Sequence, residues 1–290
     1  MKKICQNCLI EKGRLPYVDQ ASDFREIKIE NGICNLCQTF QKNFSQQRLH
    51  EELQGFLAEK NTGKYDVILA LSGGKDSFTA LYLAKKELDL NVLAFTYQNG
   101  FIPEKVIRQS KKICQKLNVD FVIKERSLQK SLDHYLNCQD YSLSKNFDFC
   151  SLCSQNISAY SIKLMKEHDT FRLITGDNCY ESISPYVSAI RRYKPFGYKR
   201  ETITINLPFA LRVTKRQQEK ILQKIGWKNP KISKYSSNCQ IPNLIEKKFI
   251  EINGFHSEYG YLQKEIRSGF YTREEGEKFQ KKTTSIFFSL

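Results

Sequence analysis

Short apolar runs alternate with amphipathic stretches between residues 65 and 176. Four of the runs have the length and composition of buried strands, namely residues 67–71, 91–97, 119–123 and 171–176. The stretches between them, residues 76–89, 103–117 and 154–168, carry apolar positions at helical spacing. Strands that alternate with helices in this way predict an α/β fold with a parallel sheet.

Two regions with different patterns flank this core. Cysteines punctuate the chain up to residue 41, and a helical pattern follows over residues 44–59. In the third region Thr214 and Gln217 form a capping-box sequence, and Gly226 follows as a helix stop. We therefore expect a small cysteine module with a connecting helix over residues 1–62, the α/β domain over 63–185, and a helical, basic C-terminal extension that completes the site over 186–290.

The positive charge is concentrated in one segment. The chain has 290 residues and a net charge of +15. Residues 191–234 contain thirteen Lys and Arg against two Asp and Glu, whereas residues 1–62 are nearly balanced. An anionic partner such as RNA and a solvated basic face both explain this excess. No stretch has the roughly 18 uninterrupted apolar residues of a membrane span, and the MKKICQNC start lacks a signal sequence, so we expect a cytoplasmic protein without membrane contact.

The sequence SGGKDS at residues 72–77 connects the first predicted strand to the helix that follows it. Its two glycines permit a tight turn that points several backbone N–H groups at one place, and the helix N-terminus adds partial positive charge there. The run differs from the Walker loop and from the dinucleotide fingerprint. It predicts a phosphate-binding turn, with a chance Gly-Gly turn as the alternative.

This run resembles the SGGxDS signature of the PP-loop ATP pyrophosphatase superfamily, a HUP-like fold. Its members cleave ATP between the α and β phosphates and transfer AMP to a substrate oxygen. The resemblance implies that Lys75 neutralises the transferred charge and that Lys75 and Asp76 are catalytic. It also implies a loop that holds pyrophosphate and Mg²⁺ through Ser72, Gly73, Gly74, Asp76 and Ser77. Topology alone places the adenosine pocket at residues 95–100, beyond the end of the second strand.

Six of the ten cysteines lie in CxxC pairs, a spacing that indicates metal or redox chemistry in a reducing compartment. Two pairs near the N-terminus have the spacing of a zinc ribbon, in which four thiolates hold one Zn²⁺ without an open position. These predicted ligands are Cys5, Cys8, Cys34 and Cys37. Four unligated thiols are the alternative.

The third pair, Cys150 and Cys153, has no second pair, and Cys239 is its nearest plausible companion. Three cysteines can bind an iron–sulfur cluster and leave one iron open to sulfide or substrate. A redox pair beside a buried thiol is the alternative. A further possibility is a persulfide carrier at Cys150 or Cys153.

The order SGGKDS, then CSLCS, then a lone cysteine before PNL resembles the iron–sulfur-dependent tRNA 2-thiolation enzymes, over about residues 65–243. The resemblance implies a [4Fe–4S] cluster on Cys150, Cys153 and Cys239. Those enzymes carry Gly-His-Asn-x-Asp-Asp after the fourth strand, where this chain has GDNCYE; Gly176 and Asp177 are assigned to cofactor binding on this match. The missing histidine favours a small acceptor over tRNA.

Both ends of the chain resemble another branch of the superfamily, the N-acetyl sugar amidotransferases, through ICQNC with NGICNLC and through IRSGFYTREE. The leading hypothesis is an ATP-dependent sulfurtransferase that adenylates a carbonyl oxygen of a nucleobase, in tRNA or free, and replaces it with sulfur. Its sulfur donor would be sulfide or a cysteine desulfurase, and a homodimer is left open. One alternative is a sugar amidotransferase that receives ammonia from a glutaminase. The other is a non-catalytic zinc-ribbon RNA-binding protein.

Overall fold

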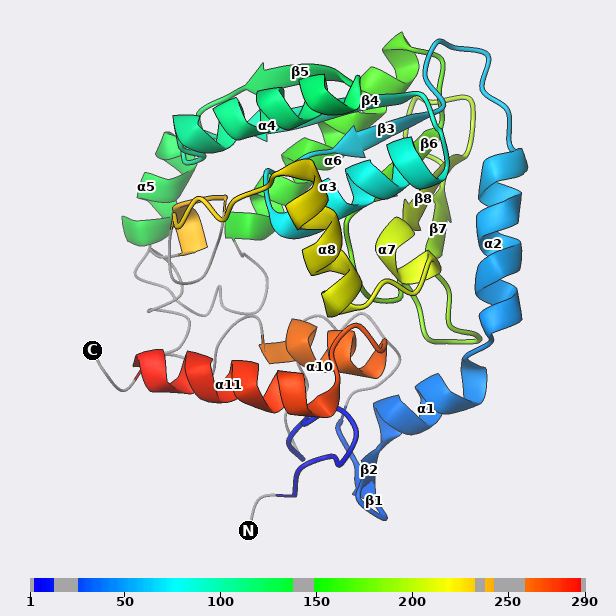
Figure 1. Cartoon of the computed structure of the whole chain (residues 1–290), viewed down its shortest axis with the longest axis vertical. Helices are drawn as coiled ribbons and strands as arrows, with labels where there is room; N and C mark the ends of the chain where they lie inside the picture. Colours follow the sequence, from blue (N-terminus) through cyan, green and yellow to red (C-terminus); the bar gives the residue numbers. More distant parts are fainter. Residues whose placement is uncertain (1–2, 13–25, 138–148, 233–237, 243–258, 288–290) are drawn as a thin grey trace.

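A six-stranded sheet forms the centre of the computed structural model, which describes residues 3–12, 26–137, 149–232, 238–242 and 259–287 (Figure 1). The strand order is β5-β4-β3-β6-β8-β7. Five strands are parallel and β7 runs antiparallel to β8 at one edge. The strands are β3 (Val67–Ala70), β4 (Val92–Gln98), β5 (Asp120–Glu125), β6 (Arg172–Thr175), β7 (Ile190–Tyr193) and β8 (Thr202–Asn206). The predicted α/β fold with a parallel sheet is confirmed.

The sheet separates two apolar cores because successive side chains of a strand point to opposite faces. Val67 and Leu69 of β3 belong to the core with α3 and α4, whereas Ile68 belongs to the core with α6. Such a strand is buried on both faces and reads as a continuous apolar run. The helices of this region are α3 (Lys75–Tyr82) with its π-helical continuation η2 (Leu83–Glu87), α4 (Glu104–Leu117), α5 (Gln129–Asn137), α6 (Phe149–Glu167), α7 (Leu207–Ala210) and α8 (Lys215–Ile225).

The sheet continues past residue 185, where the sequence pattern placed the end of the α/β domain. Strands β7 and β8 both come from the segment that was assigned to the C-terminal extension, and β8 inserts between β6 and β7. All five residues of β8 are buried, so this strand is part of the central core. The edge strand β7 exposes Arg191 and Arg192. These two consecutive charged residues break the apolar pattern of a buried strand, so the sequence predicted a basic surface here.

The N-terminal module contains two helices where the sequence predicted one over residues 44–59. The first begins at Cys34, whose side chain accepts a hydrogen bond from the Cys37 amide, and Ser45 caps the second. The predicted helix after Thr214 is confirmed, with its capping box and a left-handed Gly226 at its end. The remaining elements are β1 (Ile29–Glu30), β2 (Ile33–Cys34), α1 (Asn35–Asn43), α2 (Gln46–Ala58), α10 (Tyr259–Arg267) and α11 (Arg273–Phe287).

The N-terminal module packs against the C-terminal helices. A third apolar core joins the four N-terminal cysteines to Leu262, Ile266 and Phe270 of the α10 region. In Figure 1 the N-terminal loop lies directly beside α10 and α11. Across the described parts of the chain, no helix is both long and apolar enough to cross a membrane.

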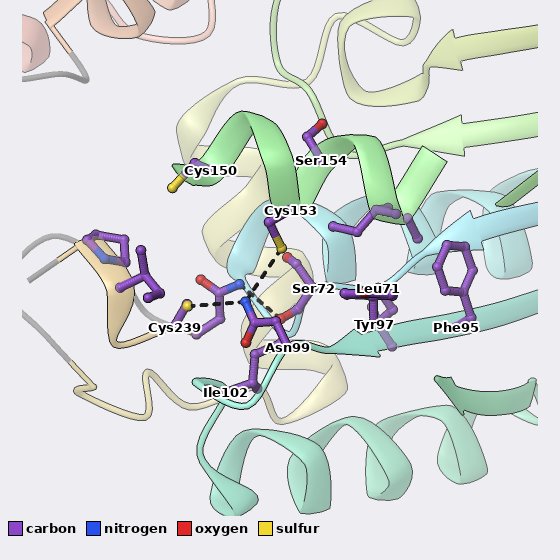
Figure 2. A pocket seen from close by; sticks show the side chains of 15 residues that line it. Leu71, Ser72, Phe95, Tyr97, Asn99, Ile102, Cys150, Cys153, Ser154 and Cys239 are labelled. Carbon is purple, nitrogen blue, oxygen red and sulfur yellow. Dashed lines mark hydrogen bonds between the residues drawn. The ribbon is translucent and has the colours of Figure 1, made fainter. Parts of the chain in front are cut away.

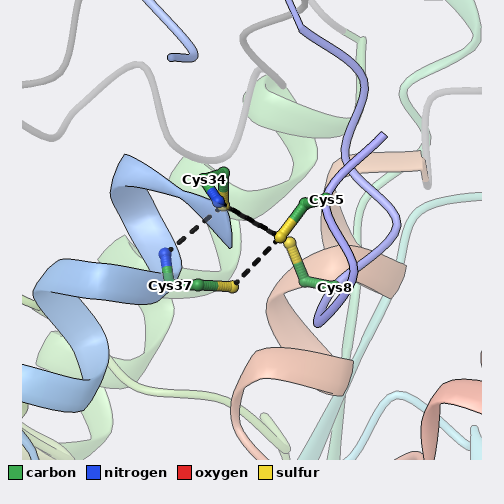
Figure 3. Close-up of side chains that lie close together, drawn as sticks. All are labelled: Cys5, Cys8, Cys34 and Cys37. Carbon is green, nitrogen blue, oxygen red and sulfur yellow. Dashed lines mark hydrogen bonds between the residues drawn. The ribbon is translucent and has the colours of Figure 1, made fainter. Parts of the chain in front are cut away.

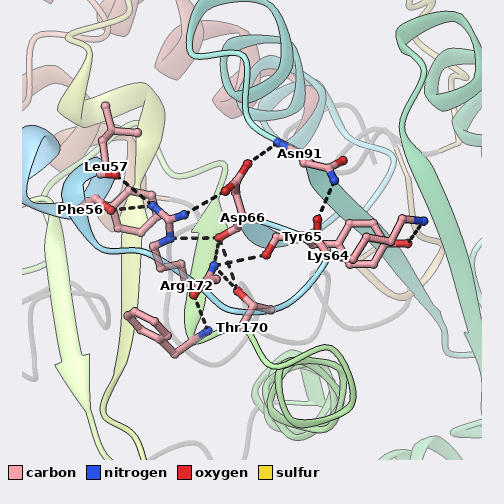
Figure 4. A network of polar contacts seen from close by, with 10 residues as sticks. Phe56, Leu57, Lys64, Tyr65, Asp66, Asn91, Thr170 and Arg172 are labelled. Atoms are coloured by element: carbon pink, nitrogen blue, oxygen red, sulfur yellow. Dashed lines mark hydrogen bonds and ion pairs between the residues drawn. The ribbon is translucent and has the colours of Figure 1, made fainter.

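A buried arginine links the connecting helix to the sheet (Figure 4). Arg172 begins β6 and is only 2% exposed. Its guanidinium donates to the Phe56 carbonyl at 2.8 Å and to the Asp66 carbonyl at 3.0 Å, and it lies 3.4 Å from the Asp66 carboxylate. These contacts give the buried guanidinium its hydrogen-bond acceptors and give the backbone carbonyls a donor.

We expect Arg172→Met to lower the free energy of unfolding by about 3 kcal/mol, because the variant removes the guanidinium that donates to the Phe56 and Leu57 carbonyls at the end of α2. Urea denaturation measures the change. Arg192→Met is the matched control, since the ion pairs that Arg192 forms within the described part of the chain, with Glu59 and Glu201, are exposed, and such pairs contribute about 0–1 kcal/mol. Equal losses for the two variants would contradict the assignment of Arg172 as an anchor.

Candidate active site and cysteine centres

The SGGKDS run forms a tight turn between β3 and α3. Gly73 has a φ of +85°, a left-handed conformation that favours glycine, and a Cβ there would collide with the Val106 side chain. Gly74 is the N-cap residue of α3 and has no side chain to occupy the helix end. The free backbone N–H groups of this helix end can bind an anion.

Two serine hydroxyls hold the turn in shape. The Gly74 amide donates to Ser72 Oγ at 3.3 Å, and Ser77 Oγ donates to the Gly74 carbonyl at 3.0 Å. The two hydroxyls are 3.2 Å apart. The turn is therefore preorganised for an anion by contacts within its own six residues.

Lys75 and Asp76 form an ion pair at the start of α3, with Nζ 2.7 Å from Oδ1. Asn178 and Gln218 also donate to Asp76 Oδ1, at 2.8 and 2.9 Å. Burial opposes ionisation of Asp76, but the Lys75 charge and these donors outweigh it and hold the pKa of Asp76 below its usual value. Burial likewise opposes the Lys75 charge, yet Asp76 and then Glu265 raise the pKa of Lys75 above its usual value. Both groups are charged at neutral pH.

Gly176 lets the end of β6 touch the phosphate turn. A Cβ at this position would lie 2.7 Å from the carbonyl carbon of Asp76 and 2.7 Å from the Ser77 amide nitrogen, closer than real side chains approach. Because Gly176 has no side chain, the backbone at the end of β6 packs directly against the backbone of Asp76 and Ser77. The other residue assigned here from the sequence, Asp177, has an exposed side chain.

A cavity of about 270 Å³ opens beside the turn (Figure 2). Its walls are largely apolar and include Leu71, Phe95 and Ile157. The wall also contains the buried Tyr97 hydroxyl, whose pKa is raised by burial although the neighbouring Arg126 guanidinium lowers it in part. Phe95, Tyr97 and Asn99 from the end of the second strand line this cavity together with Ser72 of the phosphate turn, and adenosine binding there stays a prediction.

The three candidate cluster cysteines all line this cavity. Asn99 donates through Nδ2 toward the sulfurs of both Cys153, at 3.5 Å, and Cys239, at 3.8 Å (Figure 2). The helix α6 begins before the CxxC pair, so Cys150 and Cys153 are three residues apart on one helical face. The tertiary structure therefore joins two distant segments around Asn99.

Burial raises the pKa of Cys153 and of Cys239, and the Asn99 amide offsets only part of this effect. Free thiols of this kind are weak nucleophiles at neutral pH, whereas metal coordination would deprotonate them. Among the described residues, the sulfurs of the four N-terminal cysteines all lie within 4.8 Å of one another. The sulfurs of Cys150, Cys153 and Cys239 do not form such a compact group. An iron–sulfur cluster on Cys150, Cys153 and Cys239 stays a prediction.

The four N-terminal cysteines form a compact, buried centre (Figure 3). Their sulfurs all lie within 4.8 Å of one another; Cys5 and Cys37 are 3.8 Å apart, and Cys8 and Cys34 are 3.7 Å apart. Zn–S bonds of about 2.3 Å in a tetrahedron place the sulfurs about 3.8 Å apart. The thiolate set and its dimensions fit Zn²⁺.

Comparison with known proteins identifies the superfamily. Residues 66–147 match the family described as queuosine biosynthesis protein QueC. The matched stretch begins at β3 and includes the whole SGGKDS turn, β4, α4 and β5. The chain belongs to the PP-loop ATP pyrophosphatase superfamily. Its SGGKDS turn is the PP-loop, and its sheet is the HUP-like α/β domain.

Individual relatives cover different parts of this PP-loop protein. An uncharacterized protein of Methanocaldococcus jannaschii is 25% identical over 255 residues, which are 85% of this chain and 84% of that protein. The NH₃-dependent NAD⁺ synthetase of Campylobacter jejuni subsp. doylei is 32% identical over 92 residues, 31% of this chain and 37% of the synthetase. Among solved structures, the U34-tRNA thiolase NcsA from Methanococcus maripaludis with its [4Fe–4S] cluster is 16% identical, with a TM-score of 0.41, over 97% of this chain and 88% of the thiolase.

Several residues at the PP-loop come from the C-terminal extension and were not identified from the sequence. Trp227 donates through its indole nitrogen to the Gly73 carbonyl at 3.3 Å, and Asn238 donates to the Ser72 carbonyl at 3.0 Å. Gln218 reaches Asp76 from α8. Single polar residues carry no local pattern, and only the capping box that orients α8 could have pointed toward Gln218.

The described part of the basic segment runs through β7, β8, α7 and α8. Part of its charge is balanced by exposed ion pairs: Arg191 lies 3.1 Å from Glu181, Arg192 3.5 Å from Glu201, and Arg200 3.9 Å from Asp169. Phe196 is fully exposed in the connection between β7 and β8. An RNA partner for this segment stays a prediction.

Proposed function

We propose that this protein is an ATP-dependent sulfurtransferase that activates a nucleobase carbonyl oxygen by adenylation and replaces it with sulfur. The observation that carries the proposal is the shared cavity. The PP-loop residue Ser72 and the three cysteines Cys150, Cys153 and Cys239 line the same space. Activation and sulfur delivery can therefore act on one bound substrate.

In the first step the carbonyl oxygen forms a bond to the α-phosphorus of ATP. The bond between the α-phosphorus and the bridging oxygen to the β-phosphate breaks, and pyrophosphate leaves with its electron pair. The PP-loop amides and the Lys75 ammonium stabilise the charge that develops on the phosphates. Asp76 would hold Mg²⁺, which supplies further charge neutralisation when bound.

In the second step hydrosulfide, supplied as sulfide or released from a desulfurase persulfide by a thiol reductant, attacks the activated carbon. A C–S bond forms, the C–O bond breaks, AMP leaves with the oxygen and its electron pair, and the sulfur gives up its proton to solvent. Activation is needed because an amide-like oxygen is a poor leaving group. Cys150, Cys153 and Cys239 would hold a [4Fe–4S] cluster, which supplies an open iron position for sulfide when bound.

Iron and acid-labile sulfide content of anaerobically purified protein tests this proposal. We expect about four irons per chain with absorption near 400 nm, and loss of most of both signals in Cys239→Ser. Cys114→Ser is the control, since Cys114 is buried in α4 among apolar side chains, outside the cavity. With sulfide, ATP and unmodified tRNA or free nucleobases, only the wild type and the control should form thiolated products.

A second candidate is an ATP-dependent N-acetyl sugar amidotransferase. The IRSGFYTREE segment reaches the PP-loop, where the Lys75 ammonium lies 5.8 Å from the centre of the Phe270 ring. In that reaction ammonia replaces the sulfur nucleophile, and the three cavity cysteines are structural. Zinc without iron or sulfide, together with ammonia-dependent AMP formation on an N-acetyl sugar, would favour it over thiolation.

A further inference from the structure

The helix α10 contacts the four-cysteine centre and the PP-loop region at the same time. In Figure 1 it lies between the N-terminal loop and the end of α8. Two of its residues make the contacts, Glu265 toward the PP-loop and Arg267 toward the cysteines. Residues two apart on a helix point about 200° away from each other, so one helix can bridge two sites.

Arg267 makes the contact with the cysteine centre. It is 7% exposed, and its Nη2 lies 3.7 Å from Cys8 Sγ. Its Nη1 donates to the Tyr180 hydroxyl. Four thiolates around one divalent ion carry net negative charge, which a buried guanidinium at this distance offsets. Metal binding therefore strengthens the contact that holds α10 in place.

A second arginine reinforces this junction. Arg273, at the start of α11, donates to the Cys5 carbonyl at 2.9 Å and to the Gln6 carbonyl. The chain between the two arginines contains Phe270, whose carbonyl accepts from the Lys215 amide at 3.1 Å at the start of α8. The N-terminal loop and the start of α8 are thus attached to one short segment.

Glu265 makes the contact with the PP-loop. The Asn178 amide donates to Glu265 Oε1 at 3.2 Å and to Asp76 Oδ1 at 2.8 Å, so one side chain connects the two carboxylates. Asp76 in turn fixes Lys75. A displacement of α10 would release Asn178 and leave the Lys75 and Asp76 pair without one of its supports.

The geometry points to Glu265 as a positioning residue for the PP-loop, which α10 and Arg267 connect to the metal state of the four-cysteine centre. Metal at Cys5, Cys8, Cys34 and Cys37 holds Arg267, the helix places Glu265, and Asn178 then orients Asp76. Loss of metal therefore weakens Mg·ATP binding. This inference rests on the proposed zinc and ATP binding and is independent of sulfur transfer.

Calorimetric titration of the full chain with Mg·ATP, before and after zinc is extracted with a chelator, tests the connection. We expect extraction to weaken wild-type binding about tenfold. Glu265→Met, which removes the acceptor for the Asn178 amide, should bind Mg·ATP about tenfold more weakly while it retains zinc and the wild-type melting temperature, and extraction should weaken it little further. Glu274→Met, at an exposed position of α11, should behave like the wild type.

If zinc extraction makes the protein precipitate, the Mg·ATP affinities of zinc-loaded variants test the same connection. Arg267→Met should weaken Mg·ATP binding as much as Glu265→Met does, and the double variant should bind no more weakly than either single one. Fully additive losses, or wild-type affinity in Glu265→Met, would overturn the inference. If the variants show this non-additive loss of Mg·ATP affinity but the protein forms no thiolated product, the result counts against the proposed function and leaves this inference standing.

Discussion

Lys75→Ala is expected to lower AMP and pyrophosphate formation from ATP by a factor of about 10²–10³, the usual effect of removing one group that stabilises transition-state charge. Lys75 lies at the N-terminus of α3, beside the backbone amides of the phosphate turn. Its pKa is raised above the usual lysine value, so the ammonium is charged throughout the neutral pH range. The variant also leaves the partly exposed Asp76 carboxylate without its counter-charge.

Quantification of AMP by chromatography, with sulfide and unmodified tRNA present, measures this loss. Lys111→Ala is the matched control because Lys111 is exposed on α4. Mg·ATP binding to Lys75→Ala should weaken as well, since the ground-state phosphates also contact the turn. Unchanged AMP formation, or wild-type RNA binding with no measurable ATP turnover in either protein, would favour the non-catalytic RNA-binding alternative.

Cys34→Ser is expected to abolish zinc binding and to unfold the N-terminal module. Metal binding to structural four-ligand sites contributes about 10–16 kcal/mol in isolated zinc-finger peptides, so a missing thiolate removes a large part of the stability of this small unit. Cys34 also caps α1 and lies 3.7 Å from Cys8. The remaining core around the module is small: besides the cysteines, the described part of the module contributes to it four buried apolar residues, Leu9, Ile10, Ile27 and Leu36.

Zinc content by elemental analysis and limited proteolysis of the N-terminal region check this outcome. We expect about one zinc per chain in the wild type and in Cys114→Ser, and none in Cys34→Ser. Cleavage should become rapid before residue 44 while the α/β domain resists digestion. Full zinc content with unchanged proteolysis in Cys34→Ser would contradict a four-thiolate site.

Local sequence patterns predicted the features that are formed by residues close together in the chain. The PP-loop is one, because Gly73, Gly74 and the adjacent strand and helix are contiguous in the chain. The two N-terminal CxxC pairs are another, since their spacing brings four thiols to one ion once two short loops form. The capping box at Thr214 likewise depends on only four residues.

Long-range packing decided the rest. The insertion of β8 beside β6 is set by burial of its five side chains in a core that other strands complete. Asn99 became a shared donor to Cys153 and Cys239 only when segments up to 140 residues apart met at the end of β4. Sequence spacing suggested that these cysteines cooperate but could not supply the residue that joins them.

The sequence by itself determined the tight turn at SGGKDS, the likeness to ATP-using enzymes and the grouping of the four N-terminal cysteines, because each depends on residue identity within short spans. Only the tertiary structure decided that the sheet extends past residue 185 and that Glu265 of α10 contacts Asn178 while Arg267 contacts Cys8. The physical reason is that such contacts depend on how separate elements pack, and a helix has the same local signature wherever it docks.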